Sequence, residues 1–259
     1  MKQGILVVSF GTTYRETREK NIGAIEQDIR AAYPEIPCYT AYSGDRIRKI
    51  LKERDGMVVM DSQEALQTMK EDGITQVVIQ PTHIMDGIEN HVLKEMAERW
   101  RPEFDSMQVG MPLLANQEDH EKIAEILWEA LSSQIVDKTL IFMGHGTHHG
   151  ANAVYRQLEE TFHRMGHEEV YIATVEAEPT LEDVMARMAK KQRRGVVLTP
   201  LMLVAGDHAV HDMMGAEDSY FIKLIQRGYQ VNVICKGLGE YADIRNIYVS
   251  NLKKSMEIL

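Results

Sequence analysis

The chain has 259 residues, of which 44% are hydrophobic and 26% are charged, and this is the composition of an ordinary globular protein. That length allows one large core or two lobes of about 100–150 residues each. The formal net charge of −10 disfavours nucleic acid as a partner, because phosphate binding needs a concentrated basic face.

The sequence shows no sign of a membrane or of an oxidising compartment. No stretch approaches the ~20 apolar residues that span a bilayer. The short apolar run near the N-terminus lacks a cleavage pattern of small residues, so it is interpreted as a strand. Cys38 and Cys235 cannot make a disulfide framework and form no CxxC pair. We therefore expect a cytoplasmic protein.

Short apolar runs alternate with amphipathic segments along the whole chain. Strands are expected at residues 5–10, 37–42, 75–80, 107–114, 139–144, 171–176, 195–200 and 230–235. Helices are expected at residues 14–32, 46–52, 61–73, 89–99 and 119–131, and again after each later strand. Continuous apolar strands that alternate with helices are typical of parallel sheets covered on both faces. The sequence therefore predicts an α/β fold with doubly wound parallel sheets.

The strand ends of the two halves resemble each other, which indicates an internal duplication. Two pairs of segments align without a gap, namely 4–14 with 139–149 and 76–89 with 195–208. The first alignment pairs Gly11 with Gly146. Chance similarity between apolar strand ends is the alternative interpretation. Duplication predicts two similar lobes, at residues 1–134 and 135–259. Ligands of doubly wound sheets bind at the carboxyl ends of the strands, so a cleft between the lobes is expected there.

Three strand ends of the second half carry side chains that can bind a divalent metal. These side chains are His145, Glu176 and His208. Two imidazoles and a carboxylate suit Co²⁺, Fe²⁺, Ni²⁺ or Zn²⁺ and leave coordination positions open, as metal transfer requires. In the alignments Phe10 stands opposite His145, and Glu89 stands opposite His208. Glu176 is expected in the position that Ser43 occupies in the first half.

Each of these three residues also has a simpler interpretation. A single histidine after a strand orders a loop more often than it binds a metal. The two glycines beside His145 favour a functional role, because glycine lets another group approach the backbone closely. Glu176 and His208 also have competitors nearby, namely Glu178, Asp207 and His211. The convergence of three separate segments favours the metal site over these alternatives.

Other polar side chains offer candidate contacts for a substrate. Ser9, Thr12 and Thr13 form a hydroxyl-rich turn before a helix, which could bind a carboxylate or phosphate or simply cap the helix. His83 could face the cleft, and Met202 could contact a flat apolar ligand, although methionines are more often core residues. No GxGxxG or Walker pattern supports nucleotide binding. Four histidines in helical stretches are expected at the surface, namely His91, His120, His163 and His167.

At these residues the chain resembles the chelatases of tetrapyrrole biosynthesis, most closely the anaerobic-type sirohydrochlorin cobaltochelatases. The resemblance rests on VVSFGTTY, FMGHGTHH, TVEAEP and TPLMLVAGDHAVHDM, and it runs over essentially the whole chain. It implies a two-domain chelatase fold that inserts Co²⁺ into sirohydrochlorin or precorrin-2 in anaerobic cobalamin biosynthesis, without nucleotide hydrolysis. The resemblance also implies no prosthetic group, since Co²⁺ is a substrate.

The resemblance further implies a role for particular residues. His145, Glu176 and His208 would hold the metal, with His145 also acting as a base and Glu89 taking or relaying a second proton. Substrate contacts are then expected from Ser9, Phe10, Thr12, Thr13, His83 and Met202. Three alternatives remain: a ferrochelatase for sirohydrochlorin or a porphyrin, a non-catalytic haem or tetrapyrrole carrier, and a phosphate-binding α/β module. The last leaves the cluster of two histidines and a glutamate unexplained.

Overall fold

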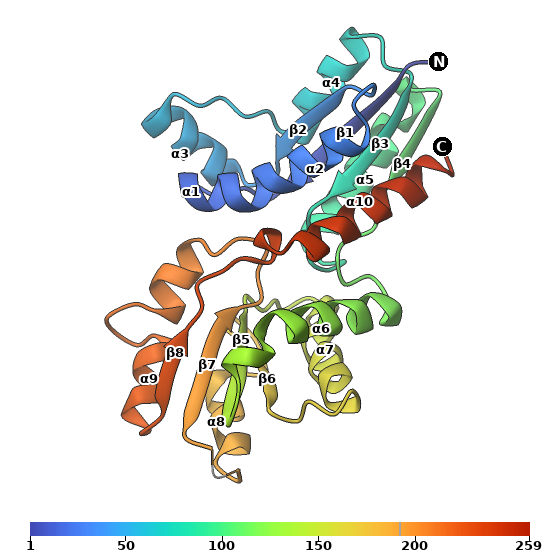
Figure 1. Ribbon diagram of the computed structural model, residues 1–259. Helices are drawn as coiled ribbons and strands as arrows, with labels where there is room; N and C mark the ends of the chain where they lie inside the picture. Colours follow the sequence, from blue (N-terminus) through green and yellow to red (C-terminus); the bar gives the residue numbers. More distant parts are fainter. Residues whose placement is uncertain (192) are drawn as a thin grey trace. The chain divides into compact units, whose positions relative to one another are not determined.

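A computed structural model describes residues 1–191 and 193–259 of the chain. The chain forms two compact units, one made of Met1–Ala115 with Gly239–Leu259 and the other of Asn116–Leu238. Each unit holds one four-stranded parallel sheet with helices packed against it (Figure 1). The α/β class and the two doubly wound parallel sheets predicted from the sequence are therefore confirmed.

The sheet of the first unit has the strand order β2-β1-β3-β4. Its strands are β1 (Gln3–Ser9), β2 (Cys38–Tyr42), β3 (Gln76–Pro81) and β4 (Ser106–Val109). Its helical segments are α1 (Arg15–Arg18), the π-helical turn η1 (Glu19–Gly23), α2 (Ala24–Ala32), α3 (Asp45–Asp55), α4 (Ser62–Glu71), α5 (Ile88–Trp100), η2 (Arg101–Glu103) and α10 (Ala242–Met256). The short turn η6 (Leu238–Glu240) leads into α10. Apolar side chains of the strands pack against α4 and α5 in one continuous core.

Helix α10 completes the first unit although it ends the chain. Tyr248 is fully buried and donates a hydrogen bond from its hydroxyl to the carbonyl of Thr82, at 3.0 Å. The guanidinium of Arg245 pairs with Asp28 of α2 at 2.6 Å. These contacts, together with packing on β3 and β4, cover the sheet face opposite α4 and α5.

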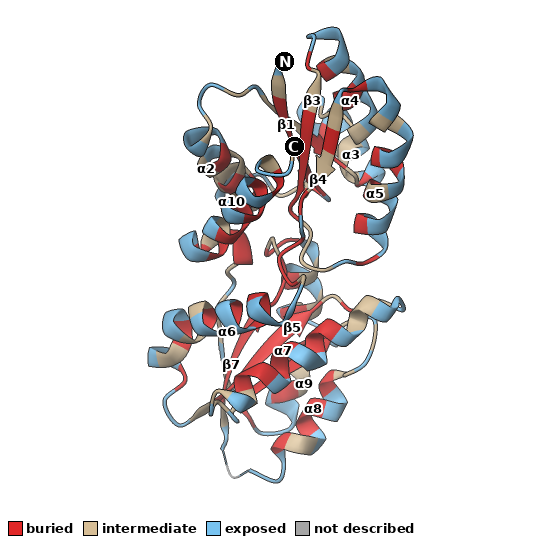
Figure 2. Ribbon diagram, turned by 90° about the vertical axis from the view of Figure 1, so that its right-hand side faces the viewer, coloured by how far each residue is buried: buried red, intermediate tan, exposed pale blue. Residues whose placement is uncertain are grey.

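The sheet of the second unit has the strand order β6-β5-β7-β8. Its strands are β5 (Lys138–Gly144), β6 (Val170–Thr174), β7 (Gly195–Pro200) and β8 (Gln230–Val233). Its helical segments are α6 (Gln117–Leu131), η3 (Ser132–Gln134), η4 (Gly150–Asn152), α7 (Ala153–Arg164), α8 (Leu181–Met188), the π-helical turn η5 (Ala209–Met213) and α9 (Tyr220–Gln226). Central strands β5 and β7 are almost wholly buried (Figure 2), as their uninterrupted apolar sequences require.

Strand pairing supports the predicted duplication in residue-level detail. Val8 pairs with Pro81 in the first sheet, and Met143 pairs with Pro200 in the second, which is the register that the two sequence alignments require. Gly11 and Gly146, which the alignment matched, both have positive φ angles, of 97° and 85°. The two units are thus built on one plan of strand order, register and turn.

The predicted lobe boundary at residues 134 and 135 does not match the structure. Helix α6, expected in the first lobe, packs on α7 and belongs to the second unit. Helix α10, expected in the second lobe, belongs to the first unit. Packing of apolar helix faces, and not continuity along the chain, decides which sheet each helix covers. The predicted cleft between the lobes stays a prediction.

No helix among residues 1–191 and 193–259 combines the length and the apolar character that crossing a membrane requires. Cys38 and Cys235 are not joined in a disulfide.

Candidate metal centre

The loop that follows β5 carries His145 and is fixed to the loop that follows β6. The carbonyl of His145 accepts hydrogen bonds from the backbone N–H groups of Val175 and Glu176, at 3.1 and 2.9 Å. Because adjacent parallel strands end at the same edge of a sheet, this pairing places the His145 and Glu176 side chains next to each other. Glu176 corresponds in this pairing to Gly44, whose N–H bonds to the carbonyl of Phe10. The sequence comparison had placed Glu176 opposite Ser43, which is one residue too early.

Three further hydrogen bonds hold the backbone around His145. The side chain of Asn152 accepts from the N–H of Thr147 at 3.0 Å and donates to the carbonyl of Glu178 at 2.6 Å. It therefore bridges the two loops that carry the candidate ligands. The backbone N–H of Gly146 donates to the hydroxyl of the buried Tyr155 at 3.3 Å.

The glycines beside His145 are required by packing within the protein. A Cβ on Gly144 would lie 2.3 Å from the ring of Tyr155. A Cβ on Gly146 would lie 2.8 Å from the backbone nitrogen of Ala177, and the positive φ of Gly146 is strained for any other residue. The close approach expected from the sequence is therefore made by the loop after β6 and by helix α7.

His208 enters the site from the end of β7. It is the residue that precedes the π-helical turn η5, and its imidazole Nδ1 lies 2.7 Å from a carboxylate oxygen of Asp212. The apolar residues at the two ends of η5, Ala209 and Met213, are fully buried in the core of the second unit and fix the turn. Asp212 escaped the sequence analysis, although the spacing of four residues between His208 and Asp212 on a helical turn was a usable signal.

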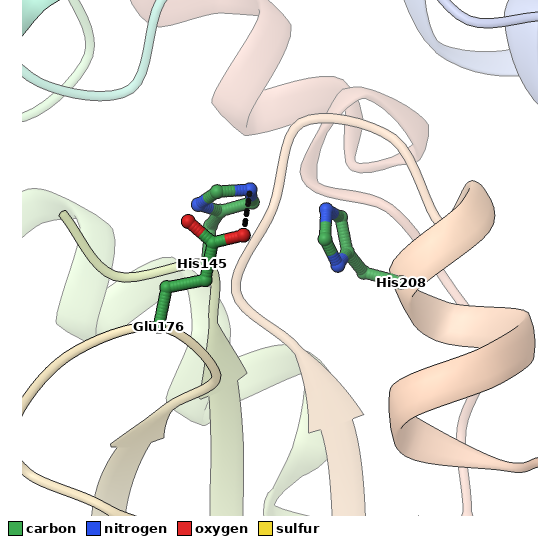
Figure 3. Close-up of side chains that lie close together, drawn as sticks. All are labelled: His145, Glu176 and His208. Atoms are coloured by element: carbon green, nitrogen blue, oxygen red, sulfur yellow. Dashed lines mark ion pairs between the residues drawn. The ribbon is translucent and has the colours of Figure 1, made fainter.

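The three predicted side chains meet at one point. Figure 3 shows His208 pointing from its helical turn towards the pair formed by His145 and Glu176. One donor atom from each residue lies within 4.8 Å of the others, and Nε2 of His145 is 3.7 Å from Oε1 of Glu176. Ligands about 2.0–2.2 Å from one ion are themselves about 3–4 Å apart, so these side chains could hold a divalent cation after a small adjustment.

The hydrogen bonds of the two imidazoles suit this role. Nδ1 of His145 lies 2.8 Å from the carbonyl oxygen of Gly146, and Nδ1 of His208 lies 2.7 Å from a carboxylate oxygen of Asp212. Both partners can only accept, so Nδ1 carries the proton in each neutral ring and Nε2 carries the lone pair. The lone pair on Nε2 of His145 then faces the carboxylate of Glu176, and neither of these two groups has a hydrogen to donate to the other. A shared cation would stabilise that arrangement.

The cluster is open to ligands. The side chains of His145, Glu176 and His208 are 45%, 53% and 33% exposed. Exposure of this extent is higher than is usual for a closed structural metal site and leaves room for an additional ligand.

The candidates in the first unit lie around the ends of β1 and β3. Burial lowers the pKa of His83, while its hydrogen bond to Asn90 and the charges of Glu89 and Asp86 act in the opposite direction. Glu89 is therefore close enough to His83 to influence it, and its own side chain lies at the exposed start of α5. Phe10 follows β1 directly and is 50% exposed, so its contact with a ligand stays a prediction.

Several other predicted contacts are placed inside the units. Ser9 is buried and accepts a hydrogen bond from the hydroxyl of Thr82 at 2.8 Å, and the buried Thr12 accepts from the N–H of Tyr14. Met202 is buried in the core of the second unit. Thr13 is partly exposed. The hydroxyl groups of Ser9 and Thr12 thus make hydrogen bonds within the first unit, and Tyr14, the residue before α1, has no side-chain cap.

The sequence of the whole chain decides the family. The model of the cobalt chelatase (CbiK) family matches residues 3–257. The chain belongs to the cobalt chelatase family. Members of this family are metal chelatases, so the open cluster of His145, Glu176 and His208 lies in a protein whose relatives handle a metal ion.

Two relatives in the cobalt chelatase family share the full length of the chain. Sirohydrochlorin cobaltochelatase of Salmonella typhimurium (strain LT2) is 34% identical over 261 residues, covering 100% of this chain and 98% of the relative. Sirohydrochlorin cobaltochelatase CbiKC of Nitratidesulfovibrio vulgaris (strain Hildenborough) is 30% identical over 266 residues, covering 100% and 92%. The structure of SirB from Bacillus subtilis with Fe³⁺ matches with a TM-score of 0.71 at 13% identity, covering 98% and 96%, and shows a shared fold.

Proposed function

We propose that this protein is a sirohydrochlorin cobaltochelatase that inserts Co²⁺ into sirohydrochlorin, or into precorrin-2, in anaerobic cobalamin biosynthesis. The observation that carries the proposal is the meeting of His145, Glu176 and His208, whose donor atoms lie within 4.8 Å of one another. The family and the names of the two full-length relatives support the choice of metal and ring.

In this proposal the three side chains hold Co²⁺ as a substrate until it passes to the ring. Insertion of Co²⁺ releases two pyrrole protons. As long as Co²⁺ is bound to Nε2 of His145, the lone pair of that nitrogen cannot accept a proton. When the ion moves to the ring nitrogens, the same lone pair becomes free, and His145 can act as general base for one pyrrole proton. Metal release and proton uptake would then be coupled at one atom.

Glu89 is proposed to take or relay the second proton. Its carboxylate is exposed at the start of α5, in the position that the duplication matches to His208. Among the proposed substrate contacts, the exposed ring of Phe10 is best suited to the flat face of a macrocycle. Ser9, Thr12, Thr13, His83 and Met202 are proposed to act mainly by shaping the loops that carry these groups.

We propose that this reaction needs neither a prosthetic group nor a nucleotide. The sequence has no Walker or GxGxxG pattern, and binding to a nitrogen macrocycle can itself drive the transfer of the metal. A cytoplasmic location is proposed from the two cysteines, which form no disulfide. The overall charge of −10 gives no support to a nucleic-acid partner.

A metallation assay tests the proposal. The purified protein is mixed with sirohydrochlorin and with Co²⁺, Fe²⁺ or Ni²⁺, and formation of each metallated ring is followed by absorbance. We expect Co²⁺ to be inserted well above the uncatalysed rate, and His145→Ala to lose most of that rate while keeping its fold by circular dichroism. Faster insertion of Fe²⁺ than of Co²⁺ would indicate a ferrochelatase. Ring binding without any acceleration would indicate a carrier.

A further inference from the structure

The two imidazoles of the metal centre have different hydrogen-bond partners. His208 has the carboxylate of Asp212 on its Nδ1, at 2.7 Å, whereas His145 has only the neutral carbonyl of Gly146, at 2.8 Å. A carboxylate on the far nitrogen fixes the orientation of a ligating ring and makes its other nitrogen a stronger donor. A neutral carbonyl fixes the orientation and adds less donor strength.

We infer that Asp212 is a positioning residue that makes His208 the stronger histidine ligand for Co²⁺, a role that rests on the proposed function. His208 anchors the ion, and His145 is the weaker ligand. The ion therefore detaches from His145 first, which frees Nε2 of His145 for a pyrrole proton while His208 still holds the metal. The order of ligand release is thus set by the difference between Asp212 and the Gly146 carbonyl.

The geometry around Asp212 is built into the fold. His208 immediately precedes the π-helical turn η5 and Asp212 lies within it, and the buried side chains of Ala209 and Met213 hold that turn against the second sheet. The end of the turn is also tight, since a Cβ on Gly215 would lie 2.3 Å from the carbonyl of His211. Asp212 therefore reaches His208 from a fixed backbone. Single π-helical turns occur often at functional sites.

The alternative is that the contact is an ordinary ion pair at the surface. The side chain of Asp212 is 39% exposed, and ion pairs at that exposure contribute little to folding. The chain has two comparable pairs in which a histidine and a carboxylate are four residues apart. His211 pairs with Asp207 at 3.2 Å, and His91 pairs with Glu95 at 3.3 Å. Neither His211 nor His91 is in the cluster of candidate ligands. These two pairs therefore serve as controls, since they show the effect of a histidine–carboxylate pair that lies outside the candidate metal site.

The test compares Co²⁺ binding in Asp212→Asn, Asp212→Ala and a matched control. We expect both variants to bind Co²⁺ about 10–100-fold more weakly than the unmodified protein. The visible d–d absorption of bound Co²⁺ should change as well, because the position of His208 is no longer fixed. Glu95→Gln removes the partner of His91 on α5 and should leave both measurements unchanged. Thermal melting separates these effects from a loss of folding, which is expected to be small.

A second comparison tests the order of the two ligands. His208→Ala should lose more Co²⁺ affinity than His145→Ala, because His208 is the ligand that the carboxylate strengthens. Unmodified affinity and spectrum in both Asp212 variants, or a larger loss for His145→Ala, would overturn the inference. If Co²⁺ binding depends on Asp212 but no ring is metallated, the proposed function fails and the positioning role remains.

Discussion

The imidazole rings of His145 and His208 lie edge to face, with their centroids 4.4 Å apart and their planes at 85°. The two rings come from the ends of different strands, β5 and β7, which pair directly in the second sheet. At this separation both rings can direct Nε2 at one ion, so the two side chains should act as one unit in binding.

This arrangement predicts non-additive effects of the two histidines. His145→Ala and His208→Ala should each weaken Co²⁺ binding by at least about tenfold, because each removes a ligand from one ion. The double variant should lose clearly less than the sum of the two free-energy losses, since either single substitution already breaks the site to which the other histidine contributes. Isothermal titration with Co²⁺ measures all three. Strictly additive losses would contradict binding of both rings to one ion.

The carboxylate of Glu176 should matter through its charge. Glu176→Gln keeps the size of the side chain and removes the negative charge that faces Nε2 of His145 at 3.7 Å. We expect Co²⁺ affinity to fall at least as far as the ~10–100-fold seen when the outer partner of a metal ligand is removed, because Glu176 is itself a candidate ligand. Glu178→Gln, two residues further in the same loop, is the matched control and should bind Co²⁺ normally. Equal losses in the two variants would assign the effect to the general charge of the loop.

Gly146→Ala should damage the metal centre more than a glycine substitution elsewhere. The added Cβ would meet the backbone nitrogen of Ala177 at 2.8 Å, so the loops that carry His145 and Glu176 must separate. Gly166→Ala is the control, because Gly166 has a similar φ of 91° and nothing within 4 Å of its Cβ position. The control should lose only about 1–2 kcal/mol of stability for its left-handed backbone and should retain Co²⁺ binding.

Urea unfolding and Co²⁺ titration of the two glycine variants give the comparison. The variant Gly146→Ala is expected to unfold at lower urea than Gly166→Ala and to lose most of its Co²⁺ affinity. Equal stability and normal Co²⁺ binding in Gly146→Ala would mean that the two loops are not held as close as the structure places them.

Two histidines whose pKa values are lowered by burial should make the fold sensitive to acid. Burial lowers the pKa of His83 in the first unit and of His120 in the second. The unfolded chain therefore binds a proton more readily than the folded chain, and stability falls as the pH drops through the ordinary histidine value of about 6.5. Well above pH ~6.5 both histidines are neutral in the folded and the unfolded chain, so they should not change the free energy of unfolding with pH.

Melting temperatures between about pH 7.5 and about pH 5.5 measure this effect. His120→Gln should show a smaller decrease on acidification than the unmodified protein, because glutamine cannot take up the proton. His91→Gln removes an exposed histidine from α5 and should leave the decrease unchanged. The same decrease in His120→Gln as in the unmodified protein would show that His120 is protonated as easily in the folded state as in the unfolded chain.

The burial of His120 also shows a limit of reasoning from helical patterns. His120 was expected at the surface because it lies in a polar helical stretch, yet it is only 4% exposed. Helix α6 packs on α7, and this contact covers a face that its own sequence does not mark as apolar. Ser9 and Thr12 were offered as ligand contacts or as helix caps, and their hydroxyl groups make hydrogen bonds within the first unit.

The strands, the parallel sheets, the duplicated plan and the three candidate ligands could all be predicted from the amino-acid sequence. Apolar runs and strand-end residues are local signals, and the carboxyl ends of adjacent parallel strands must meet at one edge. The packing of the folded chain was needed to show that α10 covers the first sheet, that Glu176 corresponds to Gly44, and that Asp212 lies behind His208. The first two depend on which surfaces pack together and on how a loop leaves its strand, and such long-range contacts leave no periodic trace in the chain. The third left a spacing of four residues, but only the fold shows that the two side chains are in contact.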